Sequence, residues 1–485
     1  MKGSPRRKFA AIAASSLLLG VAVPITARAV AATSAATIPA VPRAQCGPGS
    51  DPETGIQGRV SADDVASGRA ARGYRCNTEL VSHDNTTGGF RVQRYADKTG
   101  HVCAFYDSTL LFPTNALIGS THKTGVFVLD MTDPAHPVQT AELVTPAMQS
   151  PHESLSLNVP RGLLAADLGN PFTYPGIVDI YSVADDCRHP ALKSSLPIGA
   201  FGHEGAFSPD GNTFWVSAAG GGTLTAIDVS NPAAPVPLWI KTGIYVLGLN
   251  VGRNGNALYY AALGYNGETP GLTILDVNQI QRRVPNPQVR TISHLTWHTV
   301  SLPQTAIPVT IKGHRYLIEI DEFASTGGPL PSSDVKAKVG AARIIDIADE
   351  SHPRIISNIR LEVNTPSGRA ATINDPGANS PLQGYAGHYC AVPQRGDPGI
   401  VACSFILSGL RVFDIRDPYH PKELAYFNAP VHPAPEGGPG SNYAMSAPAF
   451  DPQRGQIWYS DGNNGFYAVR VTNGAWPFSP TFGGP

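Results

Sequence analysis

The chain has 485 residues, with 36 basic and 37 acidic side chains and a formal net charge of −1. Glycine (50 residues) and proline (44 residues) are frequent, and 42% of the residues are hydrophobic, which indicates a large core crossed by many turns. Lysine and arginine are not clustered, which argues against a nucleic-acid partner.

The first 29 residues have the pattern of an export signal. Four basic residues within the first eight positions precede a largely apolar run from Ala10 to Val23, and Ala27-Arg28-Ala29 offers a small-residue cleavage site. The tract from Pro5 to Phe9 resembles a twin-arginine signal, although proline stands where serine or threonine is usual, and an ordinary secretory signal is the alternative. We expect a secreted or extracellular protein, with the cell surface as a further location, and no membrane span in the mature chain.

Residues 30–73 are rich in alanine, proline, glycine and arginine and have no clear period. We interpret them as a linker or as an extension that lies on the surface of the fold. Strand-like patterns begin at Tyr74. The sequence therefore predicts a signal peptide over 1–29, an N-terminal extension over 30–73 and one folded domain over 74–485.

The stretch from Phe201 to Leu238 contains four short strands, each bounded by glycine, proline, asparagine or aspartate. Its third strand recurs along the chain at intervals close to the length of one such unit. The seven copies begin at Gly125, Gly176, Gly222, Gly271, Ala341, Gly409 and Gly465. Repeats of this length predict an all-β fold, a seven-bladed β-propeller of four-stranded antiparallel blades.

These third strands, for example Gly222-TLTAIDV and Gly409-LRVFDI, resemble the LVIVD repeat of bacterial and archaeal secreted and cell-surface proteins. The resemblance covers roughly residues 100–475. It implies a β-propeller. Because propellers host many unrelated activities, the resemblance implies no particular activity, and for function it suggests only an extracellular binding or scaffold protein.

Most third strands are followed by a turn that contains aspartate or asparagine and proline. Its histidines are expected to be exposed and structural: His136, His189, His352 and His420. A closed propeller often takes one strand of its last blade from the other end of the chain. Either an early strand after Tyr74 or the segment Thr472–Phe482 is expected to complete the ring.

Six cysteines in an exported chain indicate disulfides. Cys390 and Cys403 flank a turn at equal distances, so adjacent strands would place them opposite each other. The remaining cysteines leave three pairings open: Cys46, Cys76, Cys103 and Cys187. A Cys76–Cys103 pair would tie the N-terminal extension to the first blade.

Histidines recur near the start of the first strand of several repeats. The candidates are His152, His203, His298 and His388, with His101 as a fifth. Because first strands line the channel of a propeller, these side chains should converge on its axis. Imidazoles bind copper, iron and zinc, so we predict an axial metal site; a polar channel for an organic ligand and a purely structural role are the alternatives.

Glu153 and Glu204 each follow one of these histidines. With regular alternation they would face the other side of the strand, as hydrogen-bond acceptors behind the metal ligands or as contacts between blades. The gly- and pro-rich stretches 321–339 and 364–387 are interpreted as a lid over one mouth of the channel or as surface loops.

Taken together, these patterns predict a secreted binding or scaffold protein with a histidine-lined axial site and an unknown small molecule or cell-surface protein as its partner. The alternative is a metal-dependent oxidoreductase that uses copper, iron or zinc at this site. A third hypothesis is a lyase or hydrolase in which the metal ion acts as a Lewis acid. The sequence identifies no catalytic residue beyond the candidate ligands.

Overall fold

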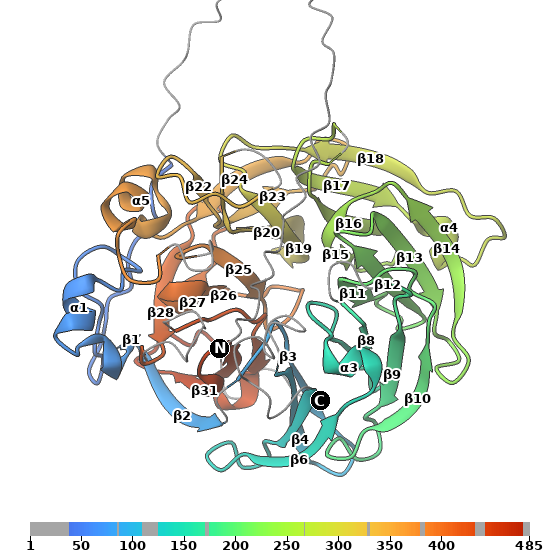
Figure 1. The fold of residues 1–485 in the computed structure, drawn as a ribbon, viewed down its shortest axis with the longest axis horizontal. Helices are drawn as coiled ribbons and strands as arrows, with labels where there is room; N and C mark the ends of the chain where they lie inside the picture. The colour runs from blue at the N-terminus through green and yellow to red at the C-terminus, as the bar shows by residue number, and fades with distance from the viewer. Residues whose placement is uncertain are drawn as a thin grey trace, which may run out of the picture. The chain divides into compact units, whose positions relative to one another are not determined.

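The computed structural model describes residues 38–84, 87–108, 125–169, 174–265, 267–326, 330–378, 384–431 and 442–478. The predicted signal peptide, 1–29, lies outside these residues. Seven sheets of four or five antiparallel strands follow one another around a ring, and the colour of Figure 1 runs around this ring in chain order. The predicted all-β, seven-bladed propeller is confirmed. None of the helices formed by the described residues has the length and apolar character needed to cross a membrane.

Each of the first four blades is a meander of four consecutive strands. Blade 1 consists of β3 (Val92–Ala96), β4 (Val102–Asp107), β5 (Val126–Asp130) and β6 (Val138–Leu143). Blade 2 consists of β7 (Ser156–Asn158), β8 (Leu163–Asp167), β9 (Val178–Ser182) and β10 (Ala191–Leu196). Blade 3 consists of β11 (Glu204–Phe207), β12 (Thr213–Ala218), β13 (Thr223–Asp228) and β14 (Val236–Thr242). Blade 4 consists of β15 (Val246–Val251), β16 (Ala257–Ala262), β17 (Gly271–Asp276) and β18 (Arg290–Leu295).

The last three blades depart from this plan by an inserted hairpin or an added strand. Blade 5 consists of β19 (Leu302–Ile311), β20 (His314–Glu322), β23 (Ala342–Asp346) and β24 (Arg354–Ile359), and the hairpin of β21 (Ala324–Ser325) and β22 (Lys338–Val339) is inserted after β20. Blade 6 consists of β25 (Gly387–Ala391), β26 (Ile400–Phe405), β27 (Gly409–Asp414) and β28 (Lys422–Asn428). Blade 7 contains β29 (Ala449–Asp451), β30 (Gln456–Asp461) and β31 (Gly465–Val471).

An early strand, not the C-terminal segment, completes the last blade. β2 (Thr78–Asp84) pairs with β31 as the outermost strand of blade 7, and β1 (Tyr74–Cys76) adds a fifth strand to blade 6 through β28. The N-terminal part of the chain thus contributes an outer strand first to blade 6 and then to blade 7 before the chain enters blade 1. This closure leaves the ring without an open seam between its first and last blades.

The seven recurring segments are the third strands of the seven blades, as predicted. First strands of neighbouring blades contact one another, for example β11 with β15 and β15 with β19, so they form the inner wall of the ring. The hydrophobic core lies between blades. Ile318 and Ile344 of blade 5, for instance, belong to one buried cluster with Val401 and Phe405 of blade 6.

Short helices connect or flank the blades. They are α1 (Ala62–Ala66), α3 (Pro146–Gln149), α4 (Asn278–Gln281) and α5 (Pro366–Thr372), with the 3-10 turns η1 (Ala70–Arg72), η2 (Glu362–Asn364), η3 (Ile406–Ser408) and η4 (Pro452–Arg454). The stretch 321–339 contains the β21–β22 hairpin and the stretch 364–387 contains α5, so both have secondary structure within the described residues.

The histidines of the repeat turn lie on the surface, as predicted. In each turn the imidazole Nδ1 is 2.8–3.0 Å from the carboxylate Oδ2 of the aspartate three residues earlier. The pairs are Asp133–His136, Asp186–His189, Asp349–His352 and Asp417–His420. The aspartate also accepts hydrogen bonds from the turn backbone, which fixes the sharp change of direction after the third strand.

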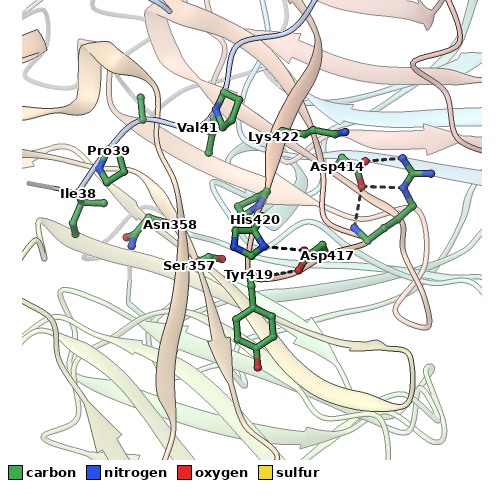
Figure 2. Close-up of a pocket in the computed structure, with 14 residues that line it drawn as sticks. Ile38, Pro39, Val41, Ser357, Asn358, Asp414, Asp417, Tyr419, His420 and Lys422 are labelled. Atoms are coloured by element: carbon green, nitrogen blue, oxygen red, sulfur yellow. Dashed lines mark hydrogen bonds and ion pairs between the residues drawn. The ribbon is translucent and has the colours of Figure 1, made fainter.

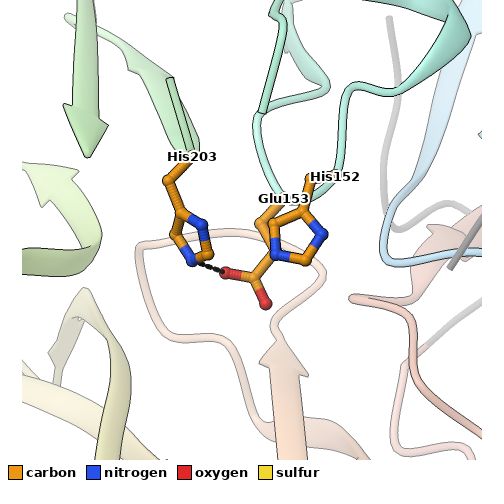
Figure 3. A group of neighbouring side chains, drawn as sticks. All are labelled: His152, Glu153 and His203. Atoms are coloured by element: carbon orange, nitrogen blue, oxygen red, sulfur yellow. Dashed lines mark ion pairs between the residues drawn. The ribbon is translucent and has the colours of Figure 1, made fainter. Parts of the chain in front are cut away.

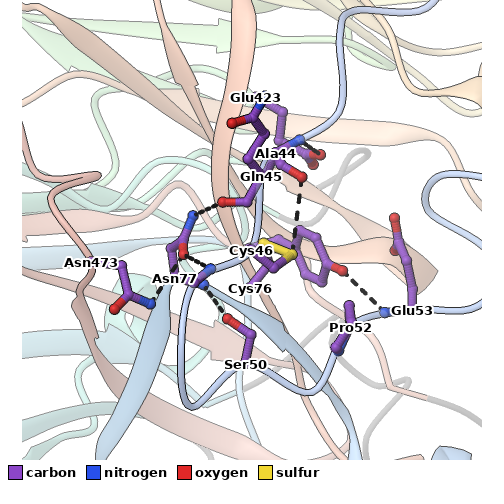
Figure 4. Close-up of a disulfide and its surroundings, with 12 residues drawn as sticks. Ala44, Gln45, Cys46, Ser50, Pro52, Glu53, Cys76, Asn77, Glu423 and Asn473 are labelled. Carbon is purple, nitrogen blue, oxygen red and sulfur yellow. Dashed lines mark hydrogen bonds between the residues drawn. A yellow bond between two sulfur atoms is a disulfide. The ribbon is translucent and has the colours of Figure 1, made fainter.

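All six cysteines form disulfides. Cys390 and Cys403 face each other on β25 and β26, as predicted from the turn between them. Cys76 pairs with Cys46 rather than with Cys103, so the extension is tied to β1 and not to blade 1 (Figure 4). Cys103 of β4 pairs with Cys187, which follows β9, and thereby links blades 1 and 2.

The Cys103–Cys187 bridge spans 84 residues and the Cys390–Cys403 bridge spans 13. Because a longer closed loop removes more entropy from the unfolded chain, loss of the first bridge should cost more stability. We expect Cys103→Ser/Cys187→Ser to lower the free energy of unfolding by about 1–2 kcal/mol more than Cys390→Ser/Cys403→Ser does. Urea unfolding of the two double variants measures this difference, and equal losses would contradict the loop-length argument.

Candidate functional site

Segments that enter the first strands of blades 2 and 3 meet at the axis. Glu153 and Glu204 form an isolated parallel β-bridge, which places the two His-Glu dipeptides side by side. His152 has a positive φ of 51°. Such a left-handed residue breaks the alternation of side chains, so His152 and Glu153 both reach the axis. Ser154 fixes this turn, since its hydroxyl oxygen lies 2.6 Å from the carbonyl oxygen of Pro151 and 2.9 Å from that of Asp167, which share its one hydrogen.

His152, Glu153 and His203 form a compact group of potential metal ligands (Figure 3). One ligand atom from each lies within 4.8 Å of the others, and the three residues are only 2–6% exposed. His203 Nε2 is 3.1 Å from Glu153 Oε2, and the rings of His152 and His203 have centroids 4.5 Å apart. Among the described residues, Nδ1 of His203 has no hydrogen-bond partner and Nε2 faces only the Glu153 carboxylate, which is unusual for a buried imidazole.

A second group shares Glu153 and adds residues from blades 5 and 6. Glu322 ends β20 and His388 lies on β25, and both are buried. His388 Nε2 is 3.3 Å from Glu153 Oε1 and 3.1 Å from Glu322 Oε2. Gln304 of β19 donates from Nε2 to Glu153 Oε1 (2.7 Å). The axis therefore holds two overlapping groups, and either could hold a metal ion.

The hydrogen bonds of His388 define how its ring is used. Its Nδ1 is 2.6 Å from the carbonyl oxygen of Met445, which can only accept, so Nδ1 carries a hydrogen. Nε2 then faces the carboxylates of Glu153 and Glu322, an arrangement that is favourable only with a cation between them or a proton on Nε2. Burial opposes protonation of His388, but the hydrogen bonds and charges of the two carboxylates outweigh it and raise its pKa to about 10.

In the metal-free protein this pKa predicts a pH-dependent stability. The pKa of His388 is about 10 in the folded state, above the usual 6.5 of a histidine. A raised folded-state pKa contributes stability that is complete below pH 6.5 and is lost as the pH rises towards 10. We expect the free energy of unfolding to fall by roughly 2–4 kcal/mol over this range, and by much less in His388→Gln. Urea unfolding in the presence of a chelator tests this, and parallel pH profiles would contradict it.

A layer of polar side chains borders the two groups. Arg91, which precedes β3, forms an ion pair with Glu204 and donates from Nε to the carbonyl oxygen of Glu153 (2.8 Å). Tyr389 donates to Glu204 Oε2 (3.3 Å), and the guanidinium of Arg91 lies 4.4 Å from the centre of its ring. Burial raises the pKa of Glu204 to about 8, although the charge of Arg91 opposes this shift. Asp107 holds the segment in place, because it accepts from the backbone N–H groups of Phe90 and Arg91, each at 2.8 Å.

The structure brings together three of the five histidines proposed as ligands: His152, His203 and His388. The expectation that His101 and His298 also reach the axis is wrong. His101 lies between β3 and β4, next to Asp97 and Thr99, because blade 1 begins one strand earlier than the spacing suggested. His298 is exposed in the turn between β18 and β19. In blade 5 the side chain that reaches the axis is Gln304 instead.

The expected orientation of the two glutamates holds for only one of them. Glu204 points towards Arg91 and Tyr389 from blades 1 and 6, a contact between blades. Glu153 does not face away from the histidines but lies between them, because of the left-handed backbone at His152.

Sequence reasoning missed four residues of the site, none of which is a histidine or belongs to a recognised motif: Arg91, Gln304, Glu322 and Tyr389. One available signal was Gly248, where blade 4 departs from the histidine pattern. A Cβ at this position would lie 2.1 Å from the carbonyl oxygen of Gln304 and 2.3 Å from Glu204 Oε2, so only glycine leaves room for that carboxylate.

Two cavities lie near different parts of the ring. One of about 710 Å³ lies between the N-terminal segment 38–42 and the repeat turn of blade 6, where His420 is paired with Asp417 (Figure 2). Its imidazole and carboxylate are exposed and serve the turn. The other, of about 300 Å³, is bounded by first strands and reaches Arg91 and Tyr389, beside the axial groups. Only the second cavity approaches the candidate metal site.

Comparison with known proteins supports the fold. A family model described as the LVIVD repeat matches residues 215–238, from β12 to β14 of blade 3. No curated protein matches the chain. The Cps50 (Swd1) β-propeller domain of Myceliophteria thermophila is 11% identical, with a TM-score of 0.50 over 81% of this chain and 100% of that one. A putative 6-phosphogluconolactonase from Bacteroides fragilis NCTC 9343 is 12% identical, with a TM-score of 0.46 over 73% and 92%.

At 11% identity the Cps50 domain is similar to this chain in fold alone. The repeat match, the seven third strands and the ring of sheets agree with one another. The chain is therefore a seven-bladed β-propeller that contains the LVIVD repeat.

Proposed function

We propose that this protein is an exported binding protein that holds one divalent transition-metal ion at the propeller axis. His152, Glu153 and His203 would be the ligands, and Glu322 and His388 would complete or border the site. The observation that carries the proposal is the convergence of these buried donors from blades 2, 3, 5 and 6 on a single carboxylate, Glu153.

The balance of buried charge supports a bound cation. Arg91 forms an ion pair with Glu204. Among the described residues, no arginine or lysine lies within ion-pair distance of the carboxylates of Glu153 and Glu322, whose side-chain partners are imidazoles and an amide. Two carboxylates buried without compensation would be strongly destabilising. A divalent ion compensates both charges. In the metal-free protein, protons on the imidazoles do so, and the ion must displace these protons to bind.

The donor types favour some of the candidate metals over others. Imidazole and carboxylate without thiolate suit zinc and iron(II), for which two histidines and one glutamate form a common ligand set, better than they suit copper(I). We therefore place zinc and iron ahead of copper(I). His203, whose only nearby partner is the Glu153 carboxylate at Nε2, would gain the ion as a further partner.

Export is supported by the three disulfides, which pair every cysteine of the chain and require an oxidising compartment to persist. Elemental analysis of protein collected after export tests the proposal. We expect close to one equivalent of zinc or iron in the parent and in His298→Ala, whose histidine lies away from the axis. Protein that contains no metal after export and after reconstitution with either ion would contradict it.

A metal-dependent oxidoreductase is the second candidate, and the cavity of about 300 Å³ that reaches Arg91 and Tyr389 favours it. A molecule in this cavity would be one layer of side chains from the axial donors. Oxygen uptake by the iron(II)-loaded protein separates the two functions. A binding protein predicts the same slow uptake for the parent and for free iron(II), and faster uptake that is lost in His203→Ala would favour the enzyme.

A further inference from the structure

The cavity of about 300 Å³ beside the axis has the features of a ligand site of its own. It is bounded by residues of β3, β15, β19, β25 and β29 and of the turn after β25, and it ends at Arg91 and Tyr389. We call it the axial funnel. Its volume suits a small organic molecule rather than a polymer.

The lining of the axial funnel is positively charged. Its described lining residues include Arg91, Arg94 and Arg395 and no carboxylate. Arg91 is paired with Glu204 and Arg94 with Asp451, both of which lie behind the wall. Arg395 has no acidic partner within ion-pair distance among the described residues. It is therefore the guanidinium whose charge remains available to a ligand.

Arg395 is held in a fixed position from two sides. Its Nη1 donates to the carbonyl oxygen of Val251 (2.7 Å) and its Nη2 to Asn250 Oδ1 (3.1 Å), both in β15. Its own carbonyl oxygen accepts from the backbone N–H of Thr310 in β19 (2.8 Å). These contacts use two of the five N–H donors of the guanidinium. The others form a rigid fork that needs little ordering when a ligand binds.

A neighbouring cavity of about 440 Å³ shares Arg395 with the funnel and adds Arg253, which also has no acidic partner among the described residues. The positive potential thus extends beyond the funnel. The lining of the funnel also includes the apolar side chains of Ile307, Val392 and Phe450. A guanidinium fork in a cavity that also has apolar side chains suits a carboxylate attached to an apolar body, and it suits a bare phosphate less well.

We propose that the axial funnel binds a small organic carboxylate, whose carboxylate pairs with Arg395 and whose apolar part contacts Ile307, Val392 and Phe450. The binding needs no metal at the axis, so it can fail or succeed independently of the proposed metal site. Under the second candidate function, such an acid would be the substrate class.

Isothermal titration with benzoate, phenylacetate and hexanoate tests this inference, with the neutral amide of each acid as its matched probe. We expect at least one acid to bind with a Kd below 5 mM and its amide to bind at least tenfold more weakly. Arg395→Gln should weaken the acid at least tenfold, because the charged fork is lost. Arg290→Gln removes the same charge from the exposed outer strand β18 and should leave the affinity unchanged.

Arg395→Lys keeps the charge and loses the fork, and we expect an intermediate affinity. Thermal unfolding of each variant shows whether it is folded. Binding of inorganic phosphate at Arg395 without any of the acids would overturn the carboxylate assignment. Failure of all three acids to bind the folded parent, or equal binding to the parent and a folded Arg395→Gln, would overturn the site itself.

Discussion

His203→Ala is expected to weaken zinc binding at least 100-fold. Loss of a group that only supports a ligand typically costs 10- to 100-fold in affinity, and His203 would be a ligand itself. Its imidazole is one of three donors within 4.8 Å of one another, and the shortened side chain leaves Glu153 without that partner. Competition with a chromophoric chelator measures the two dissociation constants.

Two histidine variants serve as controls for this measurement. His298→Ala changes an exposed imidazole in the turn before β19, and His420→Ala changes one in a repeat turn. Both should bind zinc as the parent does. If His203→Ala keeps the parental affinity while either control loses it, the ion is bound elsewhere and the axial assignment is wrong.

Arg411→Met is expected to lower the free energy of unfolding by about 3–5 kcal/mol. Arg411 is fully buried in β27 and pairs with Glu53 of the extension (2.6 Å) and with Glu423 of β28 (2.9 Å). Its guanidinium also lies 4.2 Å from the centre of the Tyr426 ring. The variant would leave two buried carboxylates without their cationic partner and would remove one of the contacts that hold the extension on blade 6. Chemical unfolding measures the loss.

Arg416→Met is the matched control for this second prediction. Arg416 also forms an ion pair with a carboxylate, that of Asp414, but its side chain is 58% exposed. Exposed pairs contribute little, so we expect a change of less than about 1 kcal/mol. Equal effects of the two variants would show that the extension is not anchored through Arg411.

The architecture could be predicted from the sequence because its signals are local and repeated. Each third strand, such as 223–228, combines alternating apolar residues with a following turn, and the recurrence of this unit gives the number of blades. The Cys390–Cys403 bridge was predictable for the same reason, since one short turn sets its geometry. The closing strand β2 was one of two alternatives, because pairing between chain ends leaves no local mark.

The candidate site was predictable only in part because it depends on register and on distant contacts. The spacing of His101 from its third strand matched the other repeats only because a long connection, 108–125, separates β4 from β5. The role of Glu153 depends on the left-handed backbone at His152, which the spacing of histidines in the sequence does not reveal. Glu322 reaches the axis from the end of a second strand, a position that the histidine pattern does not include.

The most direct test of the axial metal site is anomalous diffraction from crystals of the exported protein, with data collected on both sides of the zinc and iron absorption edges. We expect one strong peak at bonding distance from the Glu153 carboxylate and from the imidazoles of His152 and His203. Asp97, His101 and Asp186 form a third group of potential ligands, away from the axis. A peak only at that group, or no peak in crystals soaked with either metal, would contradict the axial assignment.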